Sequence, residues 1–582
     1  MNSAFPPFLP SSAVISAFNF SPGCLSPRGR SSGVVKILSP LLLLAVGGFG
    51  GALDAQLPVP LDPGTNSQSS LVARHEFVYQ SATKLDSVAL AGTFNEWKPG
   101  TTPMVSDAGG KTWRVTLNLP FGTWLYKFVV NGDTWVDDPR GGKEPDANGK
   151  VDSSITLGPR VPFQAPLYWD SYEYNLKADG SIPEKEWSAN IDWVEKNLKP
   201  YGYDMVSIDG WGDELYNQDG YRSSHARGWT HDYAWWSRNL QSRGMTLGIY
   251  NNPLWIIRAA ALAGLKIKGT DIPIRSLWDE KEKAKFTWVQ VDRPGAEQYV
   301  KGYVRYYADM GVRYLRIDFL SWYSSGHDRY LGTVGPNRSA AQYATALRWI
   351  KEACDANGIF LSLVMPDLNN GGEVEVRYGD MFRVDEDCGN GGWQRFSDQR
   401  RGGRLPGWSQ YGDPFDGLTY WSHLSGRNHV ILDPDFLRLN TFRNDDERKS
   451  AVSLCLMAGA PVTVADQYGT IGDSLWIYQN REMLALNSDG FVGQPLTTDP
   501  TNEASQTWTG RMSNGDWIVG FFNRETEPRD RGIDFASLGL MGKAAVRDLW
   551  AHQGLGQLTS YRVSVPPHGC VIVRISQNLS TP

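Results

Sequence analysis

The stretch Arg313-Tyr314-Leu315-Arg316-Ile317-Asp318 is a short run of β-forming residues that ends in an acid, and the pattern recurs along the chain. Comparable runs occupy 167–170, 205–209, 246–250, 359–364, 381–385, 429–433 and 462–465. Apolar residues at helical spacing lie between them, at 184–197, 232–243, 296–310 and 340–356. Eight strand–helix units in this order predict a (β/α)8 TIM barrel over residues 161–490.

Five of the eight predicted strands end in an acidic residue. In such a barrel the active site forms where the strands end. A ring of acids without clustered His or Cys favours carboxylate chemistry, with an oxygen-ligated Ca²⁺ or Mg²⁺ site as the minor alternative. We therefore predict catalysis without a metal or cofactor, at a sugar-binding site that contains the acids Asp170, Asp209, Asp318, Asp385, Asp387 and Asp433 and the aromatic residues Trp169, Trp211, Tyr250 and Trp393.

Two arginines accompany these acids. Arg316 precedes Asp318 by two residues, so the alternation of a strand places both side chains on one face. Arg383 keeps its charge at any working pH, so it either holds a nearby carboxylate ionised or binds a sugar hydroxyl.

The regions on either side of the barrel have a different pattern. Short alternating strands over 75–160, with the turn signal Asn131-Gly132, predict an immunoglobulin-like β-sandwich. A linker rich in Pro, Gly and Ser over 56–74 precedes it. Alternating segments over 491–582 predict a second, antiparallel β-sandwich.

Residues 1–55 have the order of a secretory signal peptide: basic residues, then an apolar run over 37–46, then small residues. We therefore expect a secreted or periplasmic protein that does not insert into a membrane once the signal is removed. The net charge of −6 argues against a nucleic-acid partner. The five cysteines do not indicate a disulfide pattern.

From about 167 to 575 the chain resembles glycoside hydrolase family 27, the α-galactosidase and α-N-acetylgalactosaminidase family. Arg316-Ile317-Asp318 matches the Lys-x-Asp motif of the family's nucleophile, and Arg383 followed by Asp387 matches its acid/base motif. Asp433-Pro434-Asp435-Phe436-Leu437 is similar to a third family signature.

The resemblance implies a retaining mechanism of double displacement. Asp318 would attack the anomeric carbon while Asp387 donates a proton to the leaving oxygen and later activates water. The positive charge of Arg316 would lower the pKa of Asp318 and keep this nucleophile ionised.

Three departures from the family put the sugar in question. The aspartate pair that binds galactose hydroxyls in the family is Asp209-Gly210 here, and Val364 stands where galactosidases place a glutamate. Arg316 replaces the lysine of the nucleophile motif. Loss of a hydroxyl-binding group changes which substrate is accepted.

The amino-terminal region resembles the glycogen-binding module of family 48, through 92–97 and 126–132. Trp97, Lys127 and Trp135 match its sugar-contacting residues, whereas Asp152 stands in place of an asparagine. The substrate is accordingly expected to be an oligo- or polysaccharide. An α-glucan-active enzyme of the isomalto-dextranase type is the alternative to an α-galactosidase, and a non-catalytic carbohydrate-binding protein is the alternative to an enzyme.

Overall fold

The computed structural model describes residues 72–577 apart from 121, 139–141, 146–149, 158–163, 178–180, 211, 214, 279–286, 389–390, 398–400, 403–410 and 427–429. The predicted signal peptide over 1–55, most of the predicted linker and Trp211 lie outside the described residues. In the described part of the chain, we find no helix that combines the length and the apolar character needed to cross a membrane.

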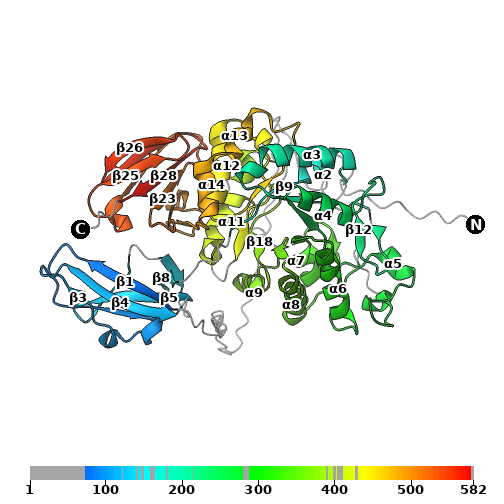
Figure 1. The fold of residues 1–582 in the computed structure, drawn as a ribbon, viewed down its shortest axis with the longest axis horizontal. Helices are drawn as coiled ribbons and strands as arrows, with labels where there is room; N and C mark the ends of the chain where they lie inside the picture. The colour runs from blue at the N-terminus through cyan, green and yellow to red at the C-terminus, as the bar shows by residue number, and fades with distance from the viewer. Residues whose placement is uncertain are drawn as a thin grey trace, which may run out of the picture.

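Eight parallel strands form the central sheet, and all eight were predicted from the sequence (Figure 1). In sheet order they are β19 (Ile431–Asp433), β18 (Met381–Arg383), β17 (Phe360–Leu363), β14 (Tyr314–Ile317), β13 (Thr246–Tyr250), β10 (Met205–Ile208), β9 (Leu167–Asp170) and β20 (Val462–Val464). Backbone hydrogen bonds of Leu437, just after β19, join this edge to β20. The predicted barrel is confirmed.

The inward-facing residues of the strands change in character from one end of the barrel to the other. The amino-terminal end is apolar and aromatic: Tyr168, Tyr314, Met381 and Ile431 pack in one cluster, and the hydroxyls of the two tyrosines lie 3.1 Å apart. Two residues further along each strand, the inward positions hold Asp170, Arg316, Arg383 and Asp433. The barrel is therefore closed by packing at one end and polar at the end where a TIM barrel carries its active site.

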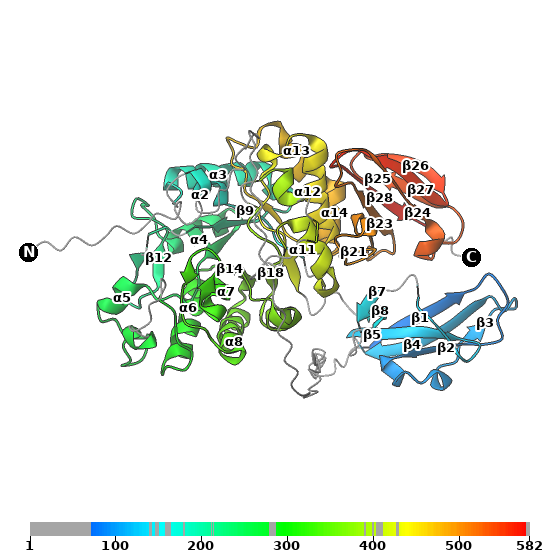
Figure 2. The same cartoon turned by 180° about the vertical axis from the view of Figure 1, so that it is seen from behind.

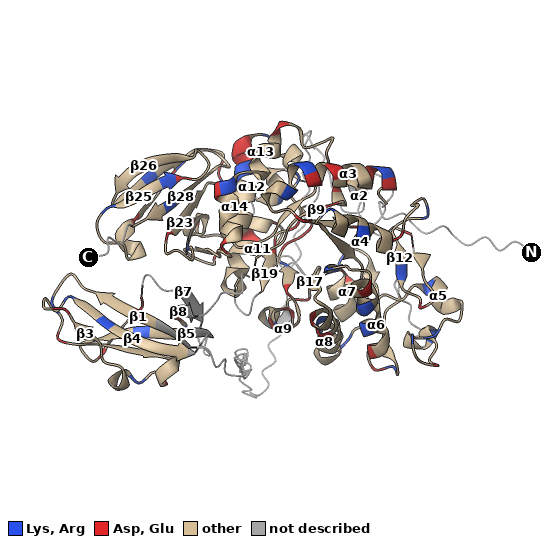
Figure 3. Ribbon diagram, viewed as in Figure 1, with Lys and Arg blue, Asp and Glu red and all other residues tan. Residues whose placement is uncertain are grey.

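Amphipathic helices surround the barrel. In α6, for example, Tyr299, Tyr303 and Tyr307 recur every four residues and are buried against the sheet. Charged residues of both signs lie along α3 and in the first turns of α12 (Figure 3). The helices are α2 (Tyr172–Lys177), α3 (Glu184–Asn197), α4 (Tyr233–Ser242), α5 (Arg258–Leu262), α6 (Ala296–Asp309), α7 (Leu320–Ser325), α8 (Ala340–Asn357), α9 (Glu373–Tyr378), α10 (Trp393–Phe396), α11 (Pro414–Trp421), α12 (Asp445–Met457), α13 (Leu475–Tyr478) and α14 (Arg481–Ser488).

The amino-terminal module is a β-sandwich, as predicted. Its first strand begins at Val72, three residues before the predicted start of the module. Phe77, Leu90, Trp113 and Phe128 form its core. One sheet holds β1 (Val72–Gln80), β4 (Thr112–Pro120) and β3 (Val105–Ser106), and the other holds β2 (Val88–Gly92), β5 (Gly122–Val130), β8 (Val151–Leu157), β7 (Gly142–Pro145) and β6 (Thr134–Val136).

The carboxy-terminal domain is also a β-sandwich and packs beside α12 and α14 (Figure 2). The Ser450 hydroxyl donates to the His568 carbonyl at 2.8 Å, and the Asn480 amide donates to the Leu549 carbonyl at 3.0 Å, so hydrogen bonds join it to the barrel. Its strands are β21 (Gln494–Pro495), β22 (Thr507–Arg511), β23 (Trp517–Phe522), β28 (Cys570–Ser576), β25 (Ala544–Asp548) and β26 (Gln553–Leu558) in one sheet, and β24 (Arg529–Asp534) with β27 (Ser560–Val565) in the other.

Candidate active site

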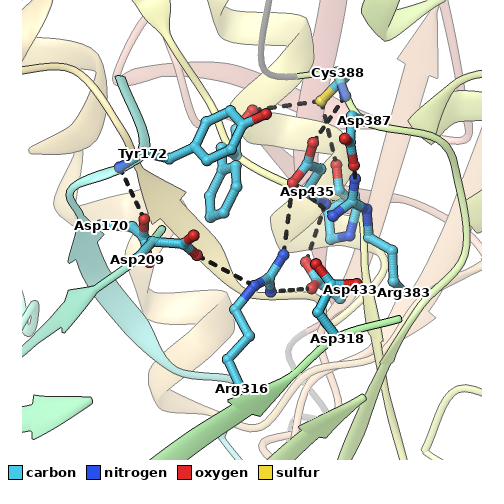
Figure 4. A network of polar contacts seen from close by, with 12 residues as sticks. Asp170, Tyr172, Asp209, Arg316, Asp318, Arg383, Asp387, Cys388, Asp433 and Asp435 are labelled. Carbon is cyan, nitrogen blue, oxygen red and sulfur yellow. Dashed lines mark hydrogen bonds and ion pairs between the residues drawn. The ribbon is translucent and has the colours of Figure 1, made fainter. Parts of the chain in front are cut away.

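Acids from five strand ends meet in one polar network around two arginines (Figure 4). Arg316 and Arg383 are both buried, and each contacts Asp435 as well as acids of its own. The acids of this network are Asp170, Asp209, Asp318, Asp385, Asp387, Asp433 and Asp435. The predicted acids are thus brought together, with carboxylates in clear excess over positive charges.

Asp318 follows β14 at a sharp turn into α7. Phe319, the next residue, has a left-handed backbone with φ of 63°, which is strained for an aromatic residue. The Asp318 carboxylate accepts a hydrogen bond from the Phe319 N–H at 2.6 Å and one from the Tyr250 hydroxyl at 2.8 Å. The amide of Asn252 donates to the Asp318 carbonyl at 2.6 Å. The carboxylate is therefore held in one orientation at the mouth of the barrel.

The charge environment of Asp318 differs from the prediction. Burial, and then the negative charge of Asp387, raise its pKa to about 6. The hydrogen bonds from Tyr250 and Phe319 and the charge of Arg316 act in the opposite direction and are weaker. Arg316 lowers the pKa of Asp318 as expected, but burial and Asp387 outweigh it, so the expectation of a pKa below the ordinary value is wrong.

Arg316 lies deeper in the barrel than Asp318. It donates to Asp433 at 2.7 Å and lies 3.6 Å from Asp209 and 3.7 Å from Asp435. All four side chains are almost completely buried. A planar guanidinium can interact with three carboxylates at once, whereas the ammonium of a lysine cannot do so with the same geometry.

Asp387 is the most exposed acid of the network, with 63% of its side chain accessible. Arg383 donates to one of its oxygens at 2.8 Å, while another nitrogen of Arg383 lies 2.8 Å from Asp435. One oxygen of Asp387 is therefore oriented by Arg383, and the side chain faces the open end of the barrel. Its charge acts on Asp318, so the two carboxylates share one site.

Four other acids of the network are buried. Burial is the main reason why the pKa of Asp209 and that of Asp435 are each raised to about 7, and why those of Asp170 and Asp385 lie well above the ordinary value. Arg383 lies 4.0 Å from Asp385, beyond hydrogen-bonding distance. Burial therefore favours the protonated form of these acids, which reduces the repulsion between the carboxylates.

Two residues of the site were given no role in the sequence analysis. Asp435 has a left-handed backbone, with φ of 70°, and accepts a hydrogen bond from the Cys388 N–H at 2.7 Å, which fixes the loop beside Asp387. Tyr172 stacks on Phe436 with ring centroids 4.4 Å apart. Both lie close to acids of the network (Figure 4). Asp435 belonged to a quoted motif, whereas nothing in the sequence distinguished Tyr172 from neighbouring aromatic residues.

A hollow that is partly open to solvent lies beside Asp318. Besides Asp318 and Tyr250, six residues that the sequence analysis did not identify line it: Arg222, Asn251, Asn252, Trp255, Ile257 and Phe319. Asn251 and Asn252 follow the end of β13 directly, so their place at the end of a barrel strand was the available signal. An aromatic wall with amide and guanidinium donors has the chemistry of a sugar site.

Two predicted substrate-binding residues lie elsewhere. Trp169 points outward from β9, is completely buried, and donates to the Asp466 carbonyl at 2.8 Å. Trp393 stacks on His568 of the carboxy-terminal domain, with centroids 4.8 Å apart. Both are packing residues, which corrects their predicted place at the substrate. In the case of Trp169 the alternation of the strand forces this, because its neighbour Asp170 points inward.

Two positions that depart from the galactosidase pattern, Asp209 and Val364, directly follow strands of the barrel. Asp209 accepts a hydrogen bond from the Gly210 N–H at 2.5 Å, and no second acid follows it. Val364 continues β17 and is buried, with 2% of its surface exposed. Val364 therefore places an apolar group at one of these positions, and Asp209 places a single carboxylate at the other.

The sugar-contacting residues predicted in the module lie together. Trp97 and Trp135 have ring centroids 6.3 Å apart, and Trp135 is 46% exposed. Lys127 lies on the same sheet as Trp135 and forms ion pairs with Asp137 and, at 3.0 Å, with Asp152. The aspartate that replaces the expected asparagine is therefore neutralised by Lys127.

The chain matches enzymes that act on carbohydrates and a domain that recognises glycogen. Residues 502–575 match the α-galactosidase C-terminal β-sandwich domain, and residues 76–161 match the glycogen recognition site of AMP-activated protein kinase. An isomalto-dextranase of Arthrobacter globiformis is 41% identical over 431 residues, which cover 71% of this chain and 67% of that protein. An α-galactosidase of Oryza sativa subsp. japonica is 25% identical, over 49% of this chain and 62% of that enzyme.

Solved structures show the same relationship. The isomalto-dextranase of Arthrobacter globiformis T6 in complex with panose superposes with a TM-score of 0.68 and 40% identity, over 71% of this chain and 72% of that one. A family 27 β-L-arabinopyranosidase from Geobacillus stearothermophilus has a TM-score of 0.57 at 20% identity, over 73% of this chain and all of that chain, which shows a shared fold.

Proposed function

The chain belongs to glycoside hydrolase family 27, and from this membership we propose that it is a retaining glycosidase with Asp318 as nucleophile and Asp387 as general acid/base. The observation that carries the proposal is that a carboxylate fixed by hydrogen bonds and an exposed carboxylate interact at the mouth of the barrel. Asp318 is held by hydrogen bonds from Tyr250 and Phe319, whereas Asp387 is exposed and interacts with it electrostatically.

The reaction proceeds in two displacements. Asp318 attacks the anomeric carbon, and the bond to the leaving oxygen breaks as that oxygen takes the proton of Asp387. The product of this step is a glycosyl ester of Asp318. A water molecule then attacks the anomeric carbon, gives its proton to Asp387 and releases Asp318, so the configuration at the anomeric carbon is retained.

The contacts of each carboxylate suit these roles. Tyr250 and the Phe319 N–H orient the Asp318 carboxylate before substrate arrives, so little reorganisation is needed at the moment of attack. Arg383 holds one oxygen of Asp387, which leaves the other to exchange a proton with the leaving group or water. Asp387 is exposed, so it can receive a proton from solvent between catalytic cycles.

For the substrate we propose an α-glucan of the dextran type. The support is the 41% identity with an isomalto-dextranase, together with the single carboxylate at Asp209 and the apolar Val364 where galactosidases bind hydroxyls. A site that lacks these partners leaves galactose hydroxyls unpaired, which is costly in a buried pocket. The exposed pair of Trp97 and Trp135 is consistent with a module that holds the polymer.

A secreted enzyme would meet an intact polysaccharide outside the cytoplasm. We therefore retain the proposal that residues 1–55 direct export and that the enzyme is secreted or periplasmic. The test is the fate of a fusion of residues 1–60 to a reporter enzyme, which should appear outside the cytoplasm.

The activity is tested with purified full-length protein on dextran, isomaltooligosaccharides and the p-nitrophenyl α-glucoside, α-galactoside, α-N-acetylgalactosaminide and β-L-arabinopyranoside. We expect hydrolysis of dextran, with the α-anomer formed first in ¹H NMR spectra. Asp318→Ala and Asp387→Ala should each abolish turnover of dextran. Asp271→Ala is the matched control, because its side chain is 99% exposed and pairs with Lys266 rather than with a residue of the network.

Two results would contradict the proposal. If the enzyme hydrolyses the α-galactoside but not dextran, its substrate is an α-galactoside and not an α-glucan. Sugar binding without turnover of any substrate would make the chain a carbohydrate-binding protein.

A further inference from the structure

A short hairpin follows the helix that begins at the nucleophile. Helix α7 starts two residues after Asp318, and β15 (His327–Asp328) and β16 (Gly332–Thr333) come next, paired antiparallel. Arg329, Tyr330 and Leu331 form the tip of the hairpin. The tip therefore belongs to the loop after β14, one of the loops that build the active-site end of a TIM barrel.

Asp328 fixes the shape of the tip. One of its oxygens accepts hydrogen bonds from the Tyr330 N–H at 2.9 Å and from the Leu331 N–H at 2.7 Å. The other accepts a hydrogen bond from the indole of Trp322 at 3.0 Å, which attaches the hairpin to α7. Asp328 is 7% exposed, so the backbone of the tip is held from the buried side.

An ion pair joins the hairpin to the loop of the acid/base. Arg329 pairs with Glu386, the residue directly before Asp387, and the two side chains are 22% and 20% exposed. The Glu386 N–H donates to the Tyr411 carbonyl at 3.2 Å, so a backbone hydrogen bond also holds this loop. The tip of the hairpin thus lies beside the residue that delivers the proton.

Tyr330, at the tip of the hairpin, has an exposed aromatic ring. Its side chain is 53% exposed, and the guanidinium of Arg329 lies over it at 5.0 Å from the ring centroid. The cation covers one face of the ring and fixes its orientation. An exposed, oriented ring flanked by a guanidinium and a carboxylate can stack on a pyranose and hydrogen-bond to its hydroxyls.

We propose that Tyr330 is the platform for the first sugar of the leaving chain, with Arg329 and Glu386 beside it as partners for that sugar's hydroxyls. The inference rests on the proposed function, because Asp387 protonates the leaving oxygen and the leaving sugar must therefore lie on its side of the scissile bond. The ligand class is a neutral α-linked glucosyl residue of an oligo- or polysaccharide.

The proposal separates substrates by their leaving group. An isomaltooligosaccharide places a sugar over Tyr330, whereas an α-glycosyl fluoride of the same released sugar leaves that position empty. Removal of the ring should therefore affect the first substrate and spare the second, since catalysis by Asp318 and Asp387 is unchanged.

The test compares Tyr330→Ala, Tyr330→Trp and the parent, all full-length, on both substrates. For Tyr330→Ala we expect kcat/KM on the oligosaccharide to fall roughly threefold to tenfold, the loss of one aromatic contact, with the fluoride unaffected. Tyr330→Trp should retain activity on both. Trp476→Ala, at a Trp that is 41% exposed on α13, is the control for loss of an exposed aromatic ring.

Each result has one meaning. An equal loss on both substrates, or no loss on the oligosaccharide, overturns the assignment of Tyr330. A parent enzyme that hydrolyses no isomaltooligosaccharide overturns the proposed substrate instead, and the fluoride then reports whether the catalytic pair itself is intact.

Discussion

Tyr250→Phe removes one hydroxyl from the site and tests how the charge of Asp318 is controlled. The Tyr250 hydroxyl donates to Asp318 at 2.8 Å, and this bond lowers a pKa that burial and Asp387 have raised to about 6. A hydrogen bond to a charged group contributes about 1.5–3 kcal/mol, and one pKa unit corresponds to about 1.4 kcal/mol. Its loss should therefore raise the pKa of Asp318 by about one to two units.

The consequence is visible in the pH dependence of kcat/KM, which reports ionisations of the free enzyme. Asp318 must be ionised to attack, so activity falls as the pH drops below its pKa. The acidic limb should lie near the value of about 6 in the parent and move upward in Tyr250→Phe. The assay is hydrolysis of an α-glycoside that the parent accepts, measured between pH 4 and pH 9 in buffers of constant ionic strength, a range of roughly two units or more on each side of that value.

Tyr299→Phe is the matched control. Tyr299 is buried in α6, and its hydroxyl has no hydrogen-bond partner among the described residues, so its removal should leave the limb in place. A limb that stays at the parent's pH in Tyr250→Phe, or that moves downward, would refute the account of Asp318.

Three further changes test other parts of the structure. Arg316→Met leaves Asp433 buried without its partner at 2.7 Å and should reduce the free energy of unfolding in urea by about 3–5 kcal/mol; a variant as stable as the parent would contradict this. Burial raises the pKa of Asp209 and of Asp435 to about 7, so the folded state binds more protons than the unfolded state between about pH 4 and pH 7. Their contribution to stability is present at low pH and is lost as the pH rises through about 7. Asp435→Asn should therefore reduce the fall of Tm with pH in this range. A slope equal to that of the parent would contradict the role of Asp435. Trp135→Ala should weaken retardation of the full-length protein in glycogen-containing gels while turnover of an aryl glycoside is unchanged, and equal retardation of variant and parent would remove the module from glucan binding.

The barrel could be predicted because its signal is local. Each strand is a short apolar run, and four of the eight end in an acid or are directly followed by one, so the sequence indicated both the position of the strands and which end of the barrel is polar. Asp318 and Asp387 were likewise found from strand ends and motif spacing. What the sequence could not show is which way each side chain points: Trp169 and Asp170 are neighbours, yet one packs outward and the other faces the site.

The environment of each charge depends on contacts that are distant in sequence. Arg316 is two residues from Asp318, but its closest ion pair is with Asp433, 117 residues away. Tyr172 reaches the site through its stacking on Phe436. Such pairings arise from the closing of the barrel, and neither spacing nor composition reveals them.

The most direct test of the catalytic assignment is the product that Asp318→Ala forms in the presence of azide. Without its nucleophile the variant should be inactive on an activated α-glycoside, and azide should enter the space left by the carboxylate and attack the anomeric carbon from that side. We predict recovery of turnover and a β-glycosyl azide, identified by ¹H NMR. Full activity of Asp318→Ala without azide, or an azide product of α configuration, would contradict the assignment of Asp318 as the nucleophile.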